Sequence, residues 1–252
     1  MVHVSILQAS ELKKFYGAFC ALDGVSLSIG QGEHVSIIGP NGAGKTTLVN
    51  VLTGLLSPSA GSVTFRGRDI ARLDPVRLSR LGMARSFQLV NIFPQLSVRD
   101  TIALAAISTL GLGGRLFSSL QKNNAVWDIV ERVSALFGLS SKLEQPAKNL
   151  SQGDKKLLDV ASAFALRPEI ILLDEPTSGV STADKSNIMQ VLVRAAKETG
   201  IKAIIQVEHD MDIVFGYSSR IIAVHEGKIL ADGSPEAIRA RADVMAAVVG
   251  KL

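Results

Sequence analysis

The feature that most limits how this chain can fold is a glycine-rich turn set between an apolar strand pattern and a helical pattern. The turn begins at Gly39 and reads GPNGAGKT, which matches G-x-x-x-x-G-K-[ST] in full. The strand pattern is His34–Ile38 and the helical pattern covers residues 45–56. Because a helix N-terminus offers unpaired N–H groups and a positive dipole end, the turn predicts a phosphate-binding loop in an α/β fold.

Each residue of this loop has an expected task in binding a nucleoside triphosphate. Glycines let the backbone approach the phosphates with no side chain in the way. Lys45 is expected to place its charge against the β- and γ-phosphates, Thr46 to bind Mg²⁺ and Thr47 to donate near the α-phosphate. The predicted nucleotide-binding residues of the loop are Gly39, Pro40, Asn41, Gly42, Ala43, Gly44, Lys45, Thr46 and Thr47. A chance glycine-rich turn would produce this pattern in roughly 1% of chains of this length.

A second apolar strand pattern, residues 170–173, ends in two acids, Asp174 and Glu175. A carboxylate at the carboxyl end of a parallel strand faces the ligand crevice. Asp174 is therefore expected to hold Mg²⁺, and Glu175 to polarise a water in line with the γ-phosphate. Acids at a strand end are also an ordinary edge feature, so this prediction depends on the phosphate loop.

The order of patterns predicts an α/β fold with a parallel sheet covered on both faces. Apolar strand patterns at 34–38, 170–173 and 203–207 alternate with helical patterns at 45–56 and 183–199. Alternation of this kind is typical of parallel strands joined by helices.

Three other regions have residue patterns that differ from this alternation of strands and helices. Residues 25–29 and 62–65 are brief, bounded by glycines, and are expected to form an antiparallel β subdomain. Residues 221–224 and 228–230 flank Glu226 and Gly227 and predict a hairpin. From about residue 98 to 166 the pattern is helical with no convincing strand, which predicts an inserted helical subdomain with a flexible connection at 111–114.

Composition limits the kind of protein and the cellular compartment that are expected. It has 252 residues, 47% of them hydrophobic and 20% charged, which suits a globular core. The net charge of +4 fits phosphate ligands or an anionic membrane surface, and equally an ordinary solubility charge. One cysteine, Cys20, allows no internal disulfide, which fits a reducing compartment. The longest uncharged stretch, residues 101–114, is shorter than the roughly 20 residues of a spanning helix, and no signal peptide is recognisable, so other chains would supply any membrane part.

Four further elements, taken with the phosphate loop and the two acids, resemble the ATP-binding subunit of an ATP-binding cassette (ABC) transporter. Residues 150–154 read LSQGD and resemble the signature motif L-S-G-G-Q. Gln88 resembles the glutamine that links the magnesium site to the membrane partner, and His209 the switch histidine at the γ-phosphate. Tyr16 resembles the aromatic residue that stacks on adenine. All six elements stand in the family's order along essentially the whole chain.

The resemblance implies two ATPase subunits that face each other head to tail, with ATP and Mg²⁺ as cofactors. Glu175, His209 and Gln88 are then catalytic, Thr46, Gln88 and Asp174 hold the metal, and Tyr16 and residues 39–47 bind the nucleotide. Ser151 and Gly153 would bind the nucleotide of the other subunit, which could be identical or different. The expected partners are membrane-spanning permease subunits and, indirectly, a solute-binding protein, with no nucleic acid. The expected location is the cytoplasmic face of the inner membrane, as a peripheral subunit.

By the same resemblance the whole chain, residues 1–252, is a single P-loop NTPase domain of the ABC ATPase type. Residues 1–88 and 167–252 are expected to form the α/β core with its β subdomain, and residues 89–166 the helical subdomain that carries the signature motif. Residues 89–94 are expected to meet the membrane partner, although Phe93 could instead be buried within the helical subdomain. Gln152, Asp154 and Ser181 depart from the family's usual glycine, glutamine and aspartate, which leaves open whether the two ATP sites are equal.

A narrower resemblance points to ATPase subunits for uptake of branched-chain amino acids. It rests on residues 24–53, 85–88, 112–117 and 243–250. Related uptake of urea or small aromatic acids, lipid export, and a soluble ABC ATPase acting on ribosomes or DNA stay open as alternatives. A GTPase or small-molecule kinase is disfavoured because the chain has no Asn-Lys-x-Asp guanine motif.

Overall fold

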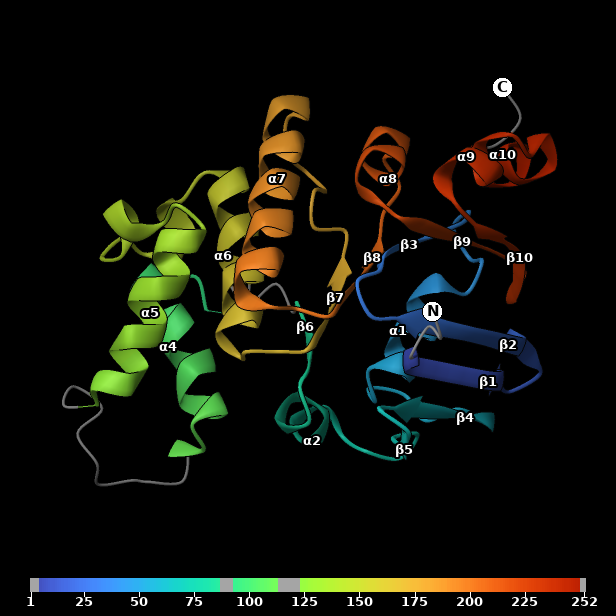
Figure 1. Ribbon diagram of the computed structural model, residues 1–252, viewed down its shortest axis with the longest axis horizontal. Helices are drawn as coiled ribbons and strands as arrows, with labels where there is room; N and C mark the ends of the chain where they lie inside the picture. The colour runs from blue at the N-terminus through green and yellow to red at the C-terminus, as the bar shows by residue number, and fades with distance from the viewer. Residues whose placement is uncertain (1–4, 87–92, 113–122, 250–252) are drawn as a thin grey trace. The chain divides into compact units, whose positions relative to one another are not determined.

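The strand that leads into the phosphate loop lies inside a mixed sheet. The computed structural model describes residues 5–86, 93–112 and 123–249, and six strands in this part of the chain form the sheet in the order β10-β9-β3-β8-β7-β6. The strand β3 pairs in parallel with β8 and β9, and β10 pairs antiparallel with β9 at the edge (Figure 1). Their bounds are β3 His34–Ile38, β6 Met83–Arg85, β7 Ile170–Asp174, β8 Ala203–Val207, β9 Arg220–His225 and β10 Lys228–Gly233.

Burial explains why the sequence signal of these strands is strong. The strands β3 and β8 are buried along their whole length, and β7 along all but Asp174. Strands buried on both faces read as continuous apolar runs rather than alternating ones. The predicted strands at 34–38, 170–173 and 203–207 are confirmed, and so is the hairpin, whose turn residues Glu226 and Gly227 both have positive φ, 48° and 75°.

A separate antiparallel sheet has the order β2-β1-β4-β5. The strands expected at 25–29 and 62–65 are confirmed, but β2 is much longer and β1 was not predicted. The strand β1 alternates buried and exposed residues and shifts register after Ala9, where Glu11 adopts a positive φ of 48°. The polar residues of β1 interrupt the apolar pattern, so the sequence did not indicate this strand. The bounds are β1 Ser5–Tyr16, β2 Phe19–Gly30, β4 Ala60–Phe65 and β5 Arg68–Asp69.

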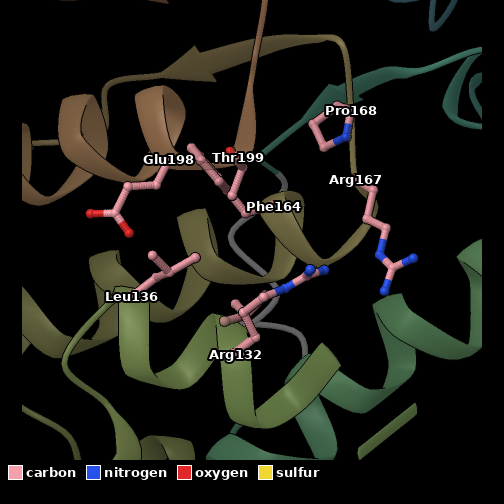
Figure 2. A pocket seen from close by; sticks show the side chains of 8 residues that line it. Arg132, Leu136, Phe164, Arg167, Pro168, Glu198 and Thr199 are labelled. Atoms are coloured by element: carbon pink, nitrogen blue, oxygen red, sulfur yellow. The ribbon is translucent and has the colours of Figure 1, made fainter. Parts of the chain in front are cut away.

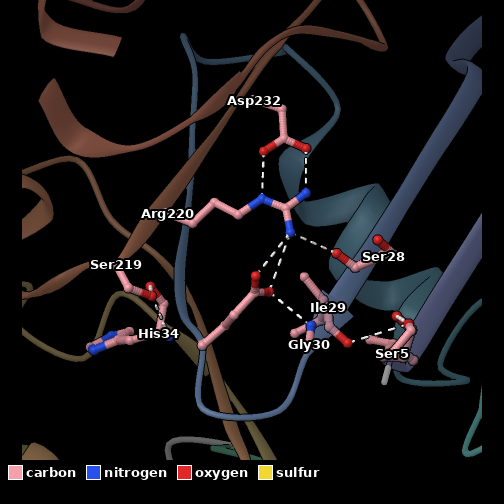
Figure 3. A network of polar contacts seen from close by, with 10 residues as sticks. Ser5, Ser28, Ile29, Gly30, His34, Ser219, Arg220 and Asp232 are labelled. Carbon is pink, nitrogen blue, oxygen red and sulfur yellow. Dashed lines mark hydrogen bonds and ion pairs between the residues drawn. The ribbon is translucent and has the colours of Figure 1, made fainter. Parts of the chain in front are cut away.

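One arginine joins the two sheets. Arg220, the first residue of β9, donates from Nε and Nη2 to the two carboxylate oxygens of Asp232, each over 2.6 Å (Figure 3). Its Nη1 donates to the Ser28 carbonyl (2.9 Å) in the antiparallel sheet and to Glu33 Oε2 (3.2 Å). The hydrogen bonds to Asp232 raise the pKa of Arg220 above its ordinary range, despite its partial burial. This network ties β2, β9 and β10 together with fixed-charge hydrogen bonds.

The first residue of β3, His34, is held by hydrogen bonds of its backbone, and its side chain is buried. The His34 N–H donates to Ser219 Oγ over 2.9 Å, and the Ser219 N–H donates to the His34 carbonyl over 2.8 Å. His34 is 9% exposed, and its buried Nε2 has no hydrogen-bond partner among the described residues. Burial lowers the pKa of His34 below its ordinary value of 6.5, with the nearby Gln206 side chain opposing in part.

The predicted helical region is confirmed in the part that the structure describes. Between residues 98 and 166 the described residues form helices and no strand, and α4, α5 and α6 pack on one another (Figure 1). The rings of Phe137 and Phe164 meet edge to face, with centroids 5.0 Å apart. Residues 113–117 of the expected connection and insert lie outside the described residues. The helices are α4 Val98–Thr109, α5 Asn124–Leu136, η3 Ser140–Lys142, η4 Ala147–Asn149, α6 Gln152–Ala165 and α7 Thr182–Thr199.

The chain divides into two compact units. The first comprises Met1–Leu81, Leu172–Glu175 and Lys202–Leu252, and the second Gly82–Ile171 and Pro176–Ile201. The second unit is larger than the expected insertion because α7 packs with α6. In the described residues, no helix is both long and apolar enough to cross a bilayer. The helices of the first unit are α1 Lys45–Leu52, α2 Pro75–Arg80, α8 Met211–Tyr217, α9 Pro235–Arg239 and α10 Ala242–Val249.

Candidate functional site

The predicted phosphate loop joins β3 to α1 and encloses its own lysine. Lys45, the first residue of α1, is 6% exposed. Its Nζ donates to the carbonyls of Gly39 (2.7 Å) and Pro40 (2.9 Å). Burial lowers the pKa of Lys45, and the charges of Glu175 and Asp174 oppose that shift. The ammonium group is therefore fixed against the backbone of the loop, where a polyphosphate needs positive charge.

Two glycines of the loop have no room for a side chain. A Cβ added to Gly39 would lie 2.1 Å from the Val224 carbonyl oxygen, and one added to Gly44 would lie 2.6 Å from that of Ala21. Gly44 also has a φ of 101°, which L-residues with side chains avoid. Both blocking atoms belong to the backbone of other strands of the first unit. The conformation of the loop therefore depends on its packing against those strands as well as on its own residues.

The two acids stand at the carboxyl end of β7, beside the end of β8. Glu175 Oε1 lies 3.0 Å from His209 Nε2, and the Glu175 N–H donates to the Val207 carbonyl over 3.0 Å. Glu175 has a positive φ of 49°, which is strained for a residue with a side chain. The side chains of Glu175 and His209 are 41% and 44% exposed, so both are accessible to a ligand.

One pocket of about 280 Å³ brings most of the predicted residues together. Gly39 and Pro40 are not among its lining residues, but their carbonyls accept hydrogen bonds from Lys45. Gln88 lies outside the described residues. The lining residues are Tyr16, Phe19, Ala21, Asn41, Gly42, Ala43, Gly44, Lys45, Thr46, Thr47, Asp174, Glu175, Val207 and His209.

Sequence reasoning missed one aromatic residue of this pocket. Phe19 is 62% exposed and pairs with Tyr16 across the turn between β1 and β2, while Tyr16 itself is 50% exposed. Two exposed aromatic side chains beside a phosphate loop suit the faces of a planar base. The available signal was the pair of aromatics on either side of a short glycine turn.

The signature-like residues begin α6, in the second unit. Ser151 is the N-cap residue: its Oγ accepts from the Asp154 N–H (3.1 Å) and donates to Asp154 Oδ2 (2.7 Å). Lys142 Nζ also reaches Asp154 Oδ2, over 2.6 Å. Partial burial acts to raise the pKa of Asp154, but the hydrogen bonds from Lys142 and Ser151 outweigh it and lower that pKa. The departure Asp154 therefore forms a capping arrangement at the start of the helix.

The departure Ser181 has the same local arrangement at the start of α7. Its Oγ accepts from the Asp184 N–H (3.3 Å) and donates to Asp184 Oδ2 (2.7 Å). Serine and aspartate are about equally good N-cap residues, so the helix start tolerates this replacement.

A mixed α/β sheet with a glycine-rich loop around a buried lysine, faced by two strand-end acids, defines a P-loop nucleotide-binding protein. A family model described as "ABC transporter" matches residues 22–178. The chain is 35% identical over 253 residues to the high-affinity branched-chain amino acid transport ATP-binding protein LivG of Salmonella typhimurium, covering 98% of each chain. The chain therefore belongs to the ABC transporter family, as an ATP-binding and ATP-hydrolysing cassette.

Similar solved structures are also ATP-binding cassettes. The ADP conformation of an ATP-binding cassette of an ABC transporter superposes with a TM-score of 0.84 at 29% identity, covering 98% of this chain and all of that one. A dimeric cassette in a post-hydrolysis state, bound to ADP and phosphate, gives a TM-score of 0.76 at 26% identity over 91% of this chain and 98% of that one.

Proposed function

We propose that this chain hydrolyses ATP to drive an importer of branched-chain amino acids. The observation that carries the proposal is the pocket in which Lys45, the β7 acids and His209 meet. The cargo follows from the similarity to LivG along nearly the whole length of both chains. The chain would act as a peripheral subunit on the cytoplasmic face of the membrane, with permease subunits and a solute-binding protein as partners.

Glu175 acts as the general base. It holds a water for in-line attack on the γ-phosphate, and His209, 3.0 Å away, fixes the carboxylate and contacts the γ-phosphate. Lys45 balances the charge of the β- and γ-phosphates. Tyr16 and Phe19 would hold the adenine, since both line the pocket beyond the loop.

Mg²⁺ fits the oxygen atoms that face this pocket. Thr46 supplies a hydroxyl and Asp174 a carboxylate, both hard oxygen ligands, and Gln88 would be a third ligand. The described residues contain no group of three or more His, Cys, Asp or Glu able to hold a metal alone. Mg²⁺ takes few protein ligands and completes its shell with phosphates and water. When bound, the ion neutralises charge on the phosphates.

Ser151 and Gly153 serve the nucleotide of a second ATPase subunit. Ser151 is exposed at the start of α6, where the first free N–H groups of the helix can donate to a γ-phosphate. The second unit would then be the part that moves with the permease, and Phe93, which is 44% exposed, suits contact with that partner. The functional division into residues 1–88 and 167–252, and 89–166, is part of this proposal.

Replacing Glu175 by glutamine tests the reaction. The variant should bind ATP as tightly as the parent chain but hydrolyse it about 10²–10⁴-fold more slowly, because the base is lost while the loop is intact. Phosphate release and nucleotide retention measure the two quantities. Glu131→Gln, on the exposed face of α5, is the matched control and should be unaffected. Near-normal hydrolysis by Glu175→Gln would contradict the assignment.

A reconstituted transporter tests the cargo. The chain is combined with its permease subunits and binding protein in vesicles, and ATP hydrolysis is measured with leucine, urea or an aromatic acid. Leucine should stimulate hydrolysis most. Stimulation by urea or the aromatic acid alone would replace the proposed cargo while leaving the ATPase assignment in place.

A further inference from the structure

A second pocket lies wholly within the helical unit, among residues that the nucleotide site does not use. Its volume is about 370 Å³, which falls in the range of small-molecule sites, about 300–1,000 Å³. Figure 2 shows its walls, which come from α5, from the end of α6 with the loop that follows, and from the end of α7. The pocket combines an apolar floor with a charged rim.

Two arginines of this rim have no polar partner in the part of the chain that the structure describes. Arg132 on α5 and Arg167 after α6 are both exposed, and neither side chain makes a hydrogen bond or ion pair within the described residues. In Figure 2 their guanidinium groups lie on the same side of the pocket. Like charges that face one space repel each other, and an anion held by both groups removes that repulsion. Guanidinium groups also match the geometry of a carboxylate.

Arg167 occupies a backbone position that disfavours arginine. Its φ is 52°, in the left-handed region, where glycine or asparagine would be less strained. Pro168 follows it and further restricts the backbone of the residue before it. Strain of this kind concentrates at functional sites, so a strained arginine that lines a pocket is an independent sign that its side chain has a use there.

The floor of the pocket is apolar and well packed. Val133 and Phe164 are each 3% exposed, and the Phe164 ring is fixed edge to face against Phe137. Leu136 completes the apolar surface and is partly exposed. A floor of this kind contacts a short aliphatic group and offers nothing to a fully hydrated ion.

A carboxylate limits the charge of any ligand. Glu198, at the end of α7, lines the pocket on the side opposite the two arginines in the view of Figure 2. Its only ion pair in the described residues is a loose one, 3.9 Å from Arg194 Nε. A second acidic group on a ligand would therefore meet repulsion at Glu198.

We propose that this pocket binds a small organic monoanion that has one carboxylate and a short aliphatic tail. Arg132 and Arg167 hold the carboxylate, and Leu136 and Phe164 pack against the tail. Glu198 discriminates against dicarboxylates. The site is independent of the nucleotide pocket and of the proposed transport function.

Calorimetric titration of the full-length chain tests the site with four probes. 4-Methylpentanoate has both parts of the proposed ligand, acetate has only the head, 4-methylpentan-1-ol has only the tail, and glutarate has a second carboxylate. The first should bind at least tenfold more tightly than each of the others. Equal binding of acetate or of the alcohol, or no binding of 4-methylpentanoate, would overturn the proposal.

Two variants locate the binding. Arg132→Gln and Arg167→Asn should each weaken 4-methylpentanoate binding about tenfold or more. Asparagine tolerates the left-handed backbone, so Arg167→Asn should fold at least as stably as the parent chain. Lys197→Gln removes a positive charge from α7 outside the pocket and should bind the probe normally. Weakening by Lys197→Gln to the same extent would show a general charge effect and overturn the site.

Retention of ATP is measured for the same variants and should be unchanged. Loss of probe binding with normal ATP retention supports a separate site. Parallel loss of both would show that the variants damage the fold or the nucleotide pocket, and would overturn the proposed independence of the two sites.

Discussion

The phosphate loop and the start of α6 both present helix N-termini, but they differ in how completely the chain surrounds them. Around the loop, backbone atoms of Ala21 and Val224 close on the glycines, and Lys45 is buried among carbonyls and acids. At α6, Ser151 and Gln152 are exposed, and within the described residues the Ser151 hydroxyl forms hydrogen bonds only in its own turn. The comparison teaches that the chain itself closes around the phosphate loop, whereas it leaves the start of α6 open, as the proposed binding of a second subunit's nucleotide requires.

The largest expected effect separates ATP binding from hydrolysis. Ser151→Arg should reduce hydrolysis by at least about 100-fold, because a bulky side chain would stand where the partner's γ-phosphate binds. ATP retention by the isolated chain should be unchanged, since the phosphate loop is intact. Ser140→Arg, an exposed position in η3, serves as the control in both assays. Full activity of Ser151→Arg would refute the role of the signature segment.

The next effect compares two glycine-to-alanine substitutions. Gly44→Ala should lower the free energy of unfolding by about 2 kcal/mol or more, because its Cβ would lie 2.6 Å from the Ala21 carbonyl at a φ of 101°. Gly153→Ala should raise it by up to about 1 kcal/mol, because Gly153 is helical and its Cβ would meet Asp184 at an ordinary 3.6 Å. Thermal and urea unfolding measure both. Similar losses in the two variants would break the comparison.

A smaller effect is the pH dependence of stability that His34 causes, at the start of the strand before the loop. The folded-state pKa of His34 is lowered, so the unfolded chain binds more protons and stability decreases as the pH falls through 6.5. One such group changes the free energy of unfolding by at most about 1.4 kcal/mol per pH unit. Urea titrations from pH 5.5 to 7.5 should show this slope, and His34→Gln should flatten it. An unchanged slope in the variant would assign the effect to other groups.

The smallest effect tests the signature region at lower pH. Asp154→Asn removes the ion pair with Lys142 and should cost up to about 1 kcal/mol at pH 7. Because the folded-state pKa of Asp154 is lowered, its contribution is present above pH 3.8 and is lost as the pH falls through the folded-state value. The stabilities of parent and variant should therefore converge in acid. A difference that persists there would point to the capping geometry rather than to charge.

The sequence predicted the buried strands and the loop well because their signals are local. The strands β3, β7 and β8 are apolar along their length, and the loop has a fixed spacing of glycines and lysine. The helix expected at 45–56 ends earlier, at Leu52, where the Thr53 hydroxyl donates to the Val49 carbonyl over 2.7 Å. A helical pattern alone did not reveal that ending.

The parts that the sequence did not predict depend on distant contacts. The strand β1 carries polar residues and register shifts, and only its pairing with β2 and β4 reveals it. Phe19 joins the pocket through the same pairing. The aromatic and acidic residues that line the pocket come from segments more than 150 residues apart, so their 280 Å³ arrangement needed the folded chain. Whether Ser151 and Gly153 bind a second subunit's nucleotide stays a prediction.

The positive φ of Glu175 places the proposed catalytic residue in a backbone conformation that lowers the free energy of unfolding. A residue with a side chain costs about 1–3 kcal/mol in such a conformation, and glycine or asparagine would relieve part of it. Evolution towards heat resistance alone would therefore favour replacing the residue that we propose as the base, and would yield a sturdier protein without turnover. Engineered stabilisation of this cassette should leave position 175 untouched and improve other parts of the chain.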